Sequence, residues 1–505
     1  MSISSREMRA LETNAEYFGI SRLQLMENAG SRIADQIASR FKPAKTRIAV
    51  FCGLGGNGGD GFVAARHLLS QGFQIEVVLA GKPTDITSQE SRTNFNALQC
   101  LAGKINIHET ADSSLIPDVK ADVIVDALIG IGLKGAPRPP TSQLIVRINT
   151  MKGFKVAVDV PSGINSDTGE AFGEIIKADL TITFHKPKQG LEKASEYVGE
   201  LVVTGIGLPE ELEDFAGPGD VEKVTKQRCP TAHKGDSGRV LVIGGSAIFS
   251  GAPALVALAA YRAGVDLAYV AAPTVTAQAI SSMSADLITV KLDGDHLNPR
   301  NIGTLAPYLE KSTAVAIGPG LGLHKDTKDA VRQVMKLIEE RKIPLLLDAD
   351  ALKAFAEFKH KLKTPTVLTP HHGEYRILTG HELTDDLEKQ AAEVKKTAEE
   401  LGAVILLKGH TDVISDGEGC RLNFTGNPGM TVGGTGDVLS GIVAAFMAQG
   451  VDPFDAAVAG AFVNGAAGDF VALTRGFHMV ATDLLEWIPR VIDDPMSHAE
   501  VRKLG

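Results

Sequence analysis

The sequence predicts an α/β protein of two domains, each built on a mainly parallel sheet. Three observations predict this fold class. The chain has 505 residues, which is too long for one ordinary hydrophobic core. Short β-rich runs alternate with helical patterns in both halves, as in parallel sheets covered by helices on both faces. A stretch rich in charge, Gly and Pro interrupts this alternation at about residues 209–237, so we expect domains at 1–215 and 225–495.

In the first half, apolar residues at helical spacing predict an amphipathic helix over residues 21–40, before the sheet. A first buried strand at residues 47–52 leads into a glycine cluster, and a helix is expected to begin near Asp60. Five further strands are expected, at residues 75–79, 123–126, 156–159, 180–184 and 201–203.

In the second half, the alternating pattern restarts with a strand at about residues 239–243. The most apolar stretch, residues 252–273, contains Arg262 and Asp266, so it predicts a buried helix and a strand rather than a membrane span. Four later strands are expected, at residues 314–317, 344–348, 366–368 and 404–407.

Composition excludes several classes of function. A formal net charge of -10 argues against binding to nucleic acid or to an acidic membrane surface. The 4 cysteines form no CxxC pair, so neither a disulfide framework nor a zinc site is indicated. The N-terminus is polar and lacks the apolar core of a signal peptide, so we expect a cytoplasmic protein.

The glycine cluster at residues 53–61 predicts a phosphate site. Its six glycines allow positive φ angles and a close approach of the backbone to a ligand, and the helix that follows offers unpaired N–H groups. Asn57 and Asp60 interrupt the glycines, so this is not a normal Rossmann fingerprint. It is not a P-loop either, because the Lys-Ser/Thr ending of a P-loop is missing. The alternative is that the glycines form a tight turn that allows the helix and strand to pack closely and binds no ligand.

Two further strand ends carry oxygen-bearing side chains. Asp126 and Asp159 each end a strand and are followed by glycine-containing segments. Ligands bind outside the carboxyl ends of parallel strands, so these segments could meet the glycine cluster at one pocket. Asn57, Asp126 and Ser162 offer only oxygen ligands, which suits a hard cation. Either aspartate alone could instead be a loop or cap residue.

A second candidate site lies near the C-terminus, in NPGMTVGGTGDVLSG (residues 427–441). The backbone N–H groups of residues 434–437 can form an anion nest at the start of the following helix. Asp437 would then stand where a phosphoryl group meets an acceptor hydroxyl, whose proton a carboxylate can accept. The alternative is a helix N-cap aspartate beside a packing turn.

The segments GGNGGDG, DALIGIGLKG and DVPSGINSDTG resemble the signatures of the NAD(P)H-hydrate epimerase family. The resemblance implies a Rossmann-like three-layer α/β/α domain that inverts the carbon bearing the added hydroxyl, with Asp159 as the candidate catalytic group. It also implies a K⁺ ion held by Asn57, Asp126 and Ser162. The residues implied to bind the dinucleotide hydrate are Gly56, Asn57, Gly58, Gly59, Asp60, Gly130, Ile131, Gly132, Leu133, Lys134, Gly135, Ala136 and Asp159.

Six segments of the second half are similar, in order, to the ADP/ATP-dependent NAD(P)H-hydrate dehydratase family: HKGDSG, GPGLG, LDADAL, TPHHGE, KGHTD and NPGMTVGGTGDVLSG. The resemblance implies a ribokinase-like α/β domain in which Asp437 activates the substrate hydroxyl and Mg²⁺ accompanies ADP or ATP. The hydrate is implied to contact Ala252, Gly322, His371 and Asp437. The nucleotide is implied to contact Lys408, Gly409, His410, Thr411, Asp412 and Gly436.

Several alternatives stay open from the sequence. His372 stands where the family has Pro, so either His371 or His372 could face the ligand, and we choose His371 by alignment of the motif. The second half could instead be a ribokinase-like kinase of a small molecule, and the first half a dinucleotide-binding module without catalysis. The resemblance favours a bifunctional repair enzyme that takes NAD(P)H hydrates and ADP or ATP. We expect a homo-oligomer and no nucleic-acid or membrane partner.

Overall fold

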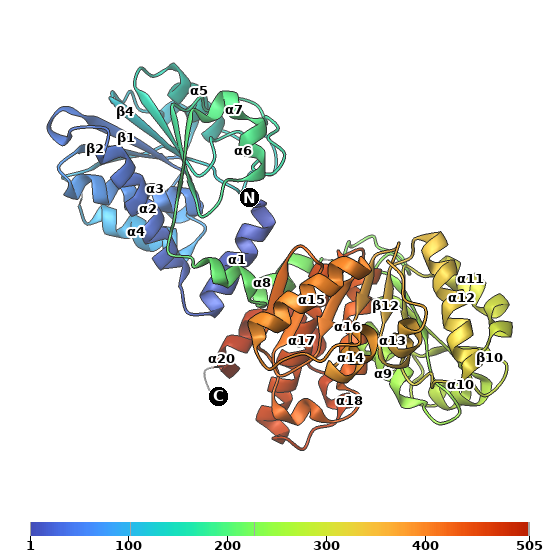
Figure 1. Cartoon of the computed structure of the whole chain (residues 1–505). Helices are drawn as coiled ribbons and strands as arrows, with labels where there is room; N and C mark the ends of the chain where they lie inside the picture. The colour runs from blue at the N-terminus through green and yellow to red at the C-terminus, as the bar shows by residue number, and fades with distance from the viewer. Residues whose placement is uncertain (1, 102, 227, 503–505) are drawn as a thin grey trace. The chain divides into compact units, whose positions relative to one another are not determined.

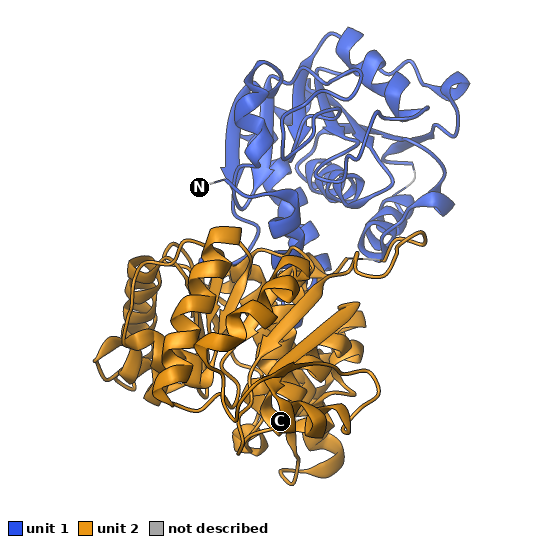
Figure 2. Ribbon diagram, turned by 90° about the vertical axis from the view of Figure 1, so that its right-hand side faces the viewer, with its two compact units in different colours: residues 1–210 blue, residues 211–505 orange. Residues whose placement is uncertain are grey.

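The computed structural model describes residues 2–101, 103–226 and 228–502 and divides into two compact units, Met1–Glu210 and Glu211–Gly505 (Figure 2). The division falls inside the stretch that is rich in charge, Gly and Pro. Helix α8 (Pro218–Val224) lies in that stretch and packs against α17 (Pro453–Arg475) of the second unit. Residues 211–224, where we expected the end of the first domain and a linker, therefore lie in the second unit.

The first unit contains a seven-stranded parallel sheet with the order β3-β2-β1-β4-β5-β6-β7 (Figure 1). Its strands are β1 (Arg47–Cys52), β2 (Gln74–Leu79), β3 (Asn106–Glu109), β4 (Val123–Ala127), β5 (Phe154–Val158), β6 (Leu180–Phe184) and β7 (Glu200–Thr204). The six strands expected from sequence are all present. The edge strand β3 was missed because its residues are mostly polar and none of them is buried.

Helices cover both faces of this sheet, which confirms the predicted three-layer α/β/α arrangement. On one face, α2 and α4 pack against α3, which contacts the central strands. On the other face, α5 buries Leu144, Ile145 and Ile148 against the sheet. The helices of this unit are α1 (Ser5–Tyr17), α2 (Arg22–Ala38), α3 (Gly56–Ser70), α4 (Gln89–Gln99), α5 (Thr141–Thr150), α6 (Gln189–Lys193) and α7 (Ser195–Val198).

The glycine cluster differs from the prediction. Helix α3 begins at Gly56, so most of the glycines lie inside the helix, and none of the six has a positive φ. Their role is close packing: a Cβ added at Gly58 would lie 1.9 Å from the carbonyl oxygen of Gly53. A Cβ at Gly61 would lie 2.7 Å from the Cβ of Ala127. The prediction of positive φ angles and of a helix start near Asp60 is wrong because glycine serves here to bring the helix against the strands.

The second unit contains a nine-stranded sheet with the order β10-β9-β8-β11-β12-β13-β14-β15-β16. The first seven strands in this order are parallel, and β15 and β16 add an antiparallel hairpin at one edge. The strands are β8 (Arg239–Ile243), β9 (Leu267–Pro273), β10 (Ile288–Leu292), β11 (Ala314–Ile317), β12 (Leu345–Leu347), β13 (Thr366–Leu368), β14 (Val404–Leu407), β15 (Asp412–Ser415) and β16 (Cys420–Asn423).

Helices again cover both faces. Helices α11 to α15 bury one extended apolar core against the strands, while α9, α16 and α17 pack on the opposite face. The helices of this unit, besides α8 and α17, are α9 (Gly251–Arg262), α10 (Thr274–Ser281), α11 (Ile302–Lys311), α12 (Lys325–Arg341), α13 (Ala349–Ala356), α14 (His372–Thr379), α15 (Leu387–Leu401), α16 (Thr435–Ala448), α18 (Ala481–Leu484), α19 (Ile488–Asp493) and α20 (His498–Arg502).

Helix α17 is the one helix in the described part of the chain that is long and apolar enough to cross a membrane. In the structure, 78% of its apolar window is buried within the second unit, as in the core helix of a folded domain. The apolar stretch at residues 252–273 forms α9 and β9, as predicted.

Each sheet reverses its strand order once. The reversal lies between β1 and β4 in the first unit and between β8 and β11 in the second. Loops that leave neighbouring strands at such a point diverge and open a crevice at the carboxyl ends of the strands. The first candidate site lies at such a point, whereas the second lies at the carboxyl ends of β12 and β14.

Candidate functional site

A cavity of about 560 Å³ lies at the carboxyl ends of the central strands of the first unit. Its wall is formed by α1, α2, the start of α3 and the loops that follow β4, β5 and β6. Of the residues predicted to bind the hydrate, those that line it are Gly56, Asn57, Asp60, Gly130, Ile131, Gly132 and Asp159.

The other predicted hydrate-binding residues lie elsewhere. Gly58 and Gly59 are buried in the packing of α3, where a Cβ at Gly59 would lie 2.4 Å from the Oγ of Ser91. Leu133, Lys134, Gly135 and Ala136 continue the loop beyond the cavity wall, and each is half-buried or exposed.

Asp159 follows β5 directly and adopts a left-handed backbone conformation with φ 64°. Such a conformation is uncommon for a residue other than glycine and is concentrated at functional sites. Its Oδ1 accepts hydrogen bonds from the Oγ1 of Thr183, at 3.0 Å, and from the ammonium group of Lys188. Lys188 is 1% exposed and also donates to Thr183 and to the carbonyl of Phe184. The two residues form a buried ion pair on the cavity wall.

Two further carboxyl groups face this ion pair. Burial and the charge of Asp159 raise the pKa of Glu12. Burial, Asp159 and Glu12 raise the pKa of Asp60 well above its ordinary range. Like charges that surround one ammonium group in a buried site favour the protonated forms of Glu12 and Asp60. The cavity therefore contains groups that can donate and accept a proton.

Asp126 and Ser162 form a buried pair beneath the cavity. The Oδ1 of Asp126 accepts a hydrogen bond from the Oγ of Ser162 at 2.7 Å, and Oδ2 accepts one from the backbone N–H of the same residue at 2.8 Å. Burial raises the pKa of Asp126 to about 6, although these hydrogen bonds lower it. A Cβ added at Gly130 would lie 3.0 Å from the Oδ1 of Asn57, and the Nδ2 of Asn57 has no hydrogen-bond partner among the described residues.

Sequence reasoning missed Glu12 and Lys188. Lys188 follows the end of β6 by four residues, so the rule that identified Asp126 and Asp159 could also have found it. Glu12 lies on α1, outside the sheet, and only the folded structure brings it to the cavity.

In the second unit, Asp437 lies in the first turn of α16, three positions after Gly434, the N-cap residue. Gly434 has φ 101°, and the side chain of Asp437 makes no cap hydrogen bond, so the N-cap alternative is wrong. Burial, the charge of Asp348 and that of Glu374 raise the pKa of Asp437 to about 7, against the opposing effect of Lys408. A carboxyl with this pKa is suited to accept a proton near neutral pH.

Lys408 joins the loops around Asp437. Its Nζ lies 3.0 Å from the Oδ1 of Asp348, whose Oδ2 accepts a hydrogen bond from the Oγ of Ser440 at 2.8 Å. Burial disfavours the charge of Lys408, but Asp348 and Glu374 outweigh this effect and raise its pKa. A Cβ at Gly436 would lie 3.3 Å from the same Nζ. The ammonium group thus faces the start of α16, where backbone N–H groups also favour an anion.

A cavity of about 400 Å³ adjoins this network. Five of the six residues predicted to bind the nucleotide line it: Lys408, Gly409, His410, Asp412 and Gly436, but not Thr411. Burial raises the pKa of Asp412 to about 6, and its carboxylate accepts hydrogen bonds from the N–H of Gly409 and from Asn423, so it holds the loop.

Asn464 of α17, which sequence reasoning missed, also lines this cavity. It is 8% exposed, and its Oδ1 has no hydrogen-bond partner in the described part of the chain. A lone Asn in an apolar helix carries no distinct signal in the sequence.

Of the residues predicted to bind the hydrate in this unit, Ala252 and Asp437 lie at helix starts and Gly322 and His371 lie in the loops after β11 and β13. The N–H of Gly245, after β8, donates to the carbonyl of Pro319, after β11, and so joins the loops that lead to Ala252 and Gly322. His371 pairs with Lys408 by a backbone bridge, but its Nδ1 accepts the N–H groups of Gly373 and Glu374 as the cap of α14.

His372 approaches the nucleotide segment instead. A Cβ at Gly409 would lie 3.5 Å from its Nε2. The structure therefore brings both histidines to the site, His371 as a helix cap and His372 beside the segment that follows β14.

Family models match both halves of the chain. Residues 240–490 match the model described as NAD(P)H-hydrate dehydratase, and residues 22–190 match the YjeF-related protein N-terminus. The bifunctional NAD(P)H-hydrate repair enzyme of Hyperthermus butylicus is 45% identical over 507 residues, covering 99% of this chain and 93% of that protein. The enzyme with the same name from Pyrobaculum aerophilum is 47% identical over 497 residues, covering 97% of this chain and 98% of that protein.

Solved structures resemble the second unit. A hypothetical protein from Streptococcus mutans matches with a TM-score of 0.50 and 26% identity over 56% of this chain and 99% of its own. The ADP/ATP-dependent NAD(P)H-hydrate dehydratase from Bacillus subtilis, co-crystallized with ATP/Mg²⁺, matches with a TM-score of 0.46 and 29% identity over 55% of this chain and 97% of its own.

Proposed function

The chain belongs to the family of bifunctional NAD(P)H-hydrate repair enzymes, and from this premise we propose how its two units divide the repair. The first unit interconverts the R and S epimers of NAD(P)H hydrate. The second unit dehydrates the S epimer to NAD(P)H and consumes ADP or ATP. A kinase of another small molecule would have no use for the first unit, so we set that alternative aside.

The environment of Asp437 carries the proposal for the second unit. Asp437 accepts the proton of the hydrate hydroxyl as the hydroxyl oxygen attacks the terminal phosphorus of the nucleotide. The bond from that phosphorus to its bridging oxygen breaks, and the shortened nucleotide leaves. The ring nitrogen lone pair then breaks the C–O bond of the new phosphate ester and expels phosphate, and loss of a neighbouring C–H proton completes the double bond. The carboxyl with a pKa of about 7, beside Lys408 and the N-terminus of α16, supports the first step.

The buried groups of the first cavity support an epimerisation through a cation. The nitrogen lone pair forms a C=N bond while the C–O bond breaks, and a protonated carboxyl of Glu12 or Asp60 releases the hydroxyl as water. Asp159, held by Lys188, stabilises the positive charge. Water then returns to the opposite face of the ring and gives its proton back to the carboxylate. Gly56, Gly130 and Gly132 would let the dinucleotide approach the backbone.

Cations are part of the proposal at both sites. The oxygen donors of Asn57, Asp126 and Ser162 suit K⁺, and the buried carboxyl of Asp126 has no cationic side chain among the causes of its raised pKa. K⁺ would supply positive charge near the bound phosphates. Mg²⁺ would neutralise polyphosphate charge in the second unit, beside Lys408 and Gly436.

The nucleotide is expected in the cavity lined by Lys408 and Gly436. The unpartnered Oδ1 of Asn464 supports this expectation, because a buried acceptor without a donor is unfavourable until a ligand supplies one. A ribose hydroxyl or an amino group of the base would do so. We expect ADP to be the preferred nucleotide.

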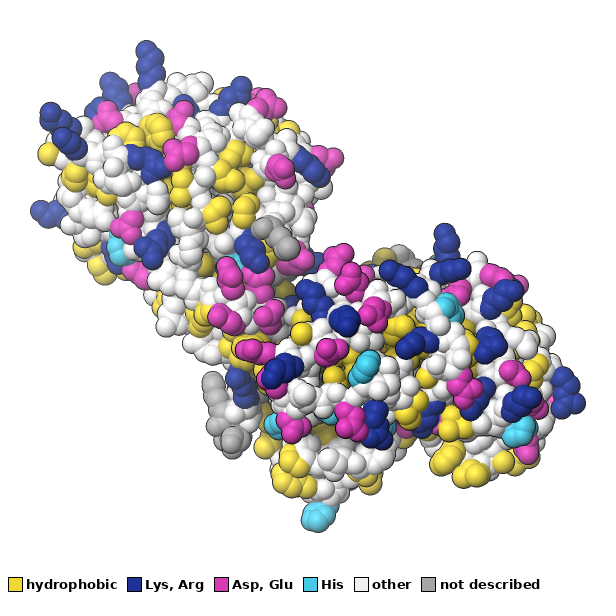
Figure 3. Space-filling view, in the orientation of Figure 1, with side chains coloured by type: hydrophobic (Ala, Val, Ile, Leu, Met, Phe, Trp, Pro, Cys, Tyr) yellow, Lys and Arg dark blue, Asp and Glu magenta, His cyan; other side chains and the backbone are white. Residues whose placement is uncertain are grey.

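The remaining features of the proposal concern partners and location. We expect a homo-oligomer in the cytoplasm with no nucleic-acid or membrane partner. The net charge of -10 supports the absence of nucleic acid. On the face drawn in Figure 3, basic and acidic side chains are interspersed rather than gathered in a basic stripe. We also propose functional domains at residues 1–215 and 225–495.

A mixture of R- and S-NADH hydrate, Mg²⁺ and ADP separates the two activities in one assay. The wild-type protein should restore the whole reduced-nicotinamide absorbance. Asp437→Asn should lower the rate by about 10²- to 10⁴-fold, the usual contribution of a general base. Asp159→Asn should convert the S fraction at the normal rate and then stop.

The control for both variants is Asp385→Asn, which makes the same chemical change at an exposed position. It should behave as wild type. Full-rate conversion by Asp437→Asn would overturn the dehydratase proposal, and full conversion of the R epimer by Asp159→Asn would overturn the role of Asp159.

A further inference from the structure

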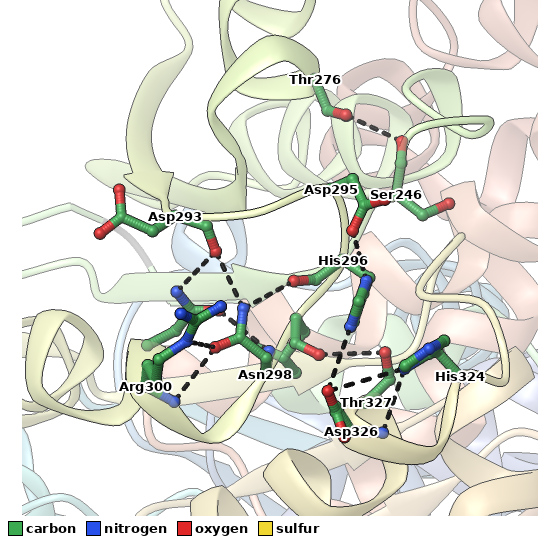
Figure 4. Close-up of polar contacts among 12 residues, drawn as sticks. Ser246, Thr276, Asp293, Asp295, His296, Asn298, Arg300, His324, Asp326 and Thr327 are labelled. Carbon is green, nitrogen blue, oxygen red and sulfur yellow. Dashed lines mark hydrogen bonds and ion pairs between the residues drawn. The ribbon is translucent and has the colours of Figure 1, made fainter.

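Two histidines and an aspartate of the second unit lie together outside both cavities described above (Figure 4). His296 lies in the segment that follows β10, while His324 and Asp326 lie at the start of α12. One ligand atom of each lies within 4.8 Å of the others. The Oδ2 of Asp326 is 3.8 Å from the Nε2 of His296 and 4.0 Å from the Nδ1 of His324.

Hydrogen bonding prepares His296 to act as a ligand. Its Nδ1 lies 2.5 Å from the Oδ1 of Asp295, so this nitrogen carries the proton that the carboxylate accepts. With the proton on Nδ1, Nε2 is the ring atom that is left to bind a metal ion. This atom is buried and has no hydrogen-bond partner among the described residues. A carboxylate that orients a histidine in this way is the usual companion of a metal-ligating imidazole.

One hydrogen bond joins the two segments, and a second one holds the backbone around His296. The Oγ1 of Thr327, on α12, donates to the carbonyl of Leu297 at 3.0 Å. The Nδ2 of Asn298 donates to the carbonyl of His296 at 3.1 Å. Figure 4 shows both bonds close to the imidazole rings, whose centroids lie 4.0 Å apart. The segments are thus positioned before any ligand arrives.

The donor set selects the class of ligand. Two imidazole nitrogens and one carboxylate oxygen suit a borderline divalent transition ion, whereas Ca²⁺ and Mg²⁺ prefer oxygen alone. Ligand bonds of about 2.0–2.2 Å place ligand atoms roughly 3.3 Å apart in a tetrahedron, so atoms that lie within 4.8 Å of one another must approach by at most about 1.5 Å. The side chains of His324 and Asp326 are 56% and 54% exposed, and binding through the Nδ1 of His324 would replace the hydrogen bond that this atom accepts from the N–H of Asp326.

We propose that His296, His324 and Asp326 bind a divalent transition-metal ion of the Zn²⁺ class. A solvent molecule fills its fourth position. The ion bridges the segment after β10 to the start of α12, and it stabilises the second unit by binding the folded chain in preference to the unfolded one. The sequence gives no sign of this site, because 28 positions separate the two histidines and no zinc-type spacing is present.

Metal binding to the full-length protein tests the proposal. Protein stripped with a chelator is titrated with Zn²⁺ by calorimetry, and with Co²⁺ by visible absorption, which reports nitrogen ligation. Wild type should bind one equivalent that His296→Ala loses, and its melting temperature should rise with Zn²⁺. Asp295→Asn, which leaves all three ligands in place, should weaken binding about 10- to 100-fold.

His478→Ala is the matched control, because His478 is exposed and lies outside the cluster. It should bind as wild type. Circular dichroism verifies that each variant is folded, and His324→Gln tests the site by a second ligand if His296→Ala does not fold. Absence of binding to wild type would overturn the proposal, and so would equal binding by wild type, His324→Gln and Asp295→Asn.

Discussion

The pH dependence of the dehydratase reaction tests the role of Asp437 quantitatively. As a general base, Asp437 must be ionised before the hydrate hydroxyl can attack the nucleotide. With a pKa of about 7, about one tenth of the molecules carry the base at about pH 6 and about nine tenths at about pH 8. The kcat/KM for S-NADH hydrate should therefore rise by about tenfold between these two conditions.

Substitution of Asp348 tests the cause of the raised pKa. Asp348 is a positioning residue, whose negative charge disfavours ionisation of Asp437. Asp348→Asn should therefore lower the pKa of Asp437 and move the acid limb of the profile to lower pH. The distant Asp385→Asn should leave the limb in place.

The assay is the initial rate of recovery of reduced-nicotinamide absorbance, with hydrate and nucleotide both limiting, across a series of buffers of constant ionic strength. A flat profile between about pH 6 and about pH 8 would refute the assignment of Asp437 as the base. A shift of the Asp348→Asn limb to higher pH would refute the electrostatic reasoning.

Three further predictions concern packing and binding. In urea denaturation, Gly58→Ala should lower the free energy of unfolding by about 1–3 kcal/mol, because the new Cβ would lie 1.9 Å from a backbone oxygen. Gly56→Ala, which places its Cβ in open space, should not lower it. Lys188→Met should lower the free energy of unfolding by about 3–5 kcal/mol in the same measurement, because it leaves the Asp159 carboxylate buried without its cation. An unchanged free energy of unfolding would contradict the buried ion pair. Asn464→Leu should raise the KM for ADP by about two- to tenfold with kcat little changed; an unchanged KM would exclude a hydrogen bond to the nucleotide.

The central architecture could be predicted from sequence because buried parallel strands are short apolar runs. Strands such as β1, β6 and β11 stand out for this reason. Edge strands carry weaker signals in the sequence. Strand β3 is the mostly polar run Asn-Ile-His-Glu, and the hairpin of β15 and β16 begins at Asp412, which we expected in a ligand-binding loop. The resemblances drawn from short motifs in both halves are confirmed by the family models and by relatives that span nearly the whole chain.

The candidate sites could be predicted only in part. The rule that ligands meet strand ends identified Asp126 and Asp159, because topology alone brings these two positions together, whereas the segment at Lys408 was identified by the resemblance to the dehydratase family. The strand-end rule could not show that Lys188 forms an ion pair with Asp159, because the direction of the buried Lys188 side chain depends on the packing of the folded chain. The raised pKa of Asp437 depends on burial and on Asp348, which lies on another loop, and neither is visible in the linear chain.

The packing of α3 limits how the first site can diversify. Side chains are excluded at Gly58, where a Cβ would meet the backbone, and at Gly61, where it would meet the strands. Gly55 and Gly56 have room, with nothing nearer than 4.0 Å to an added Cβ. In a saturation library, tolerated replacements should therefore cluster at the two open glycines. A change of cofactor specificity at this site, by evolution or by design, would therefore have to use side chains at Gly55 and Gly56.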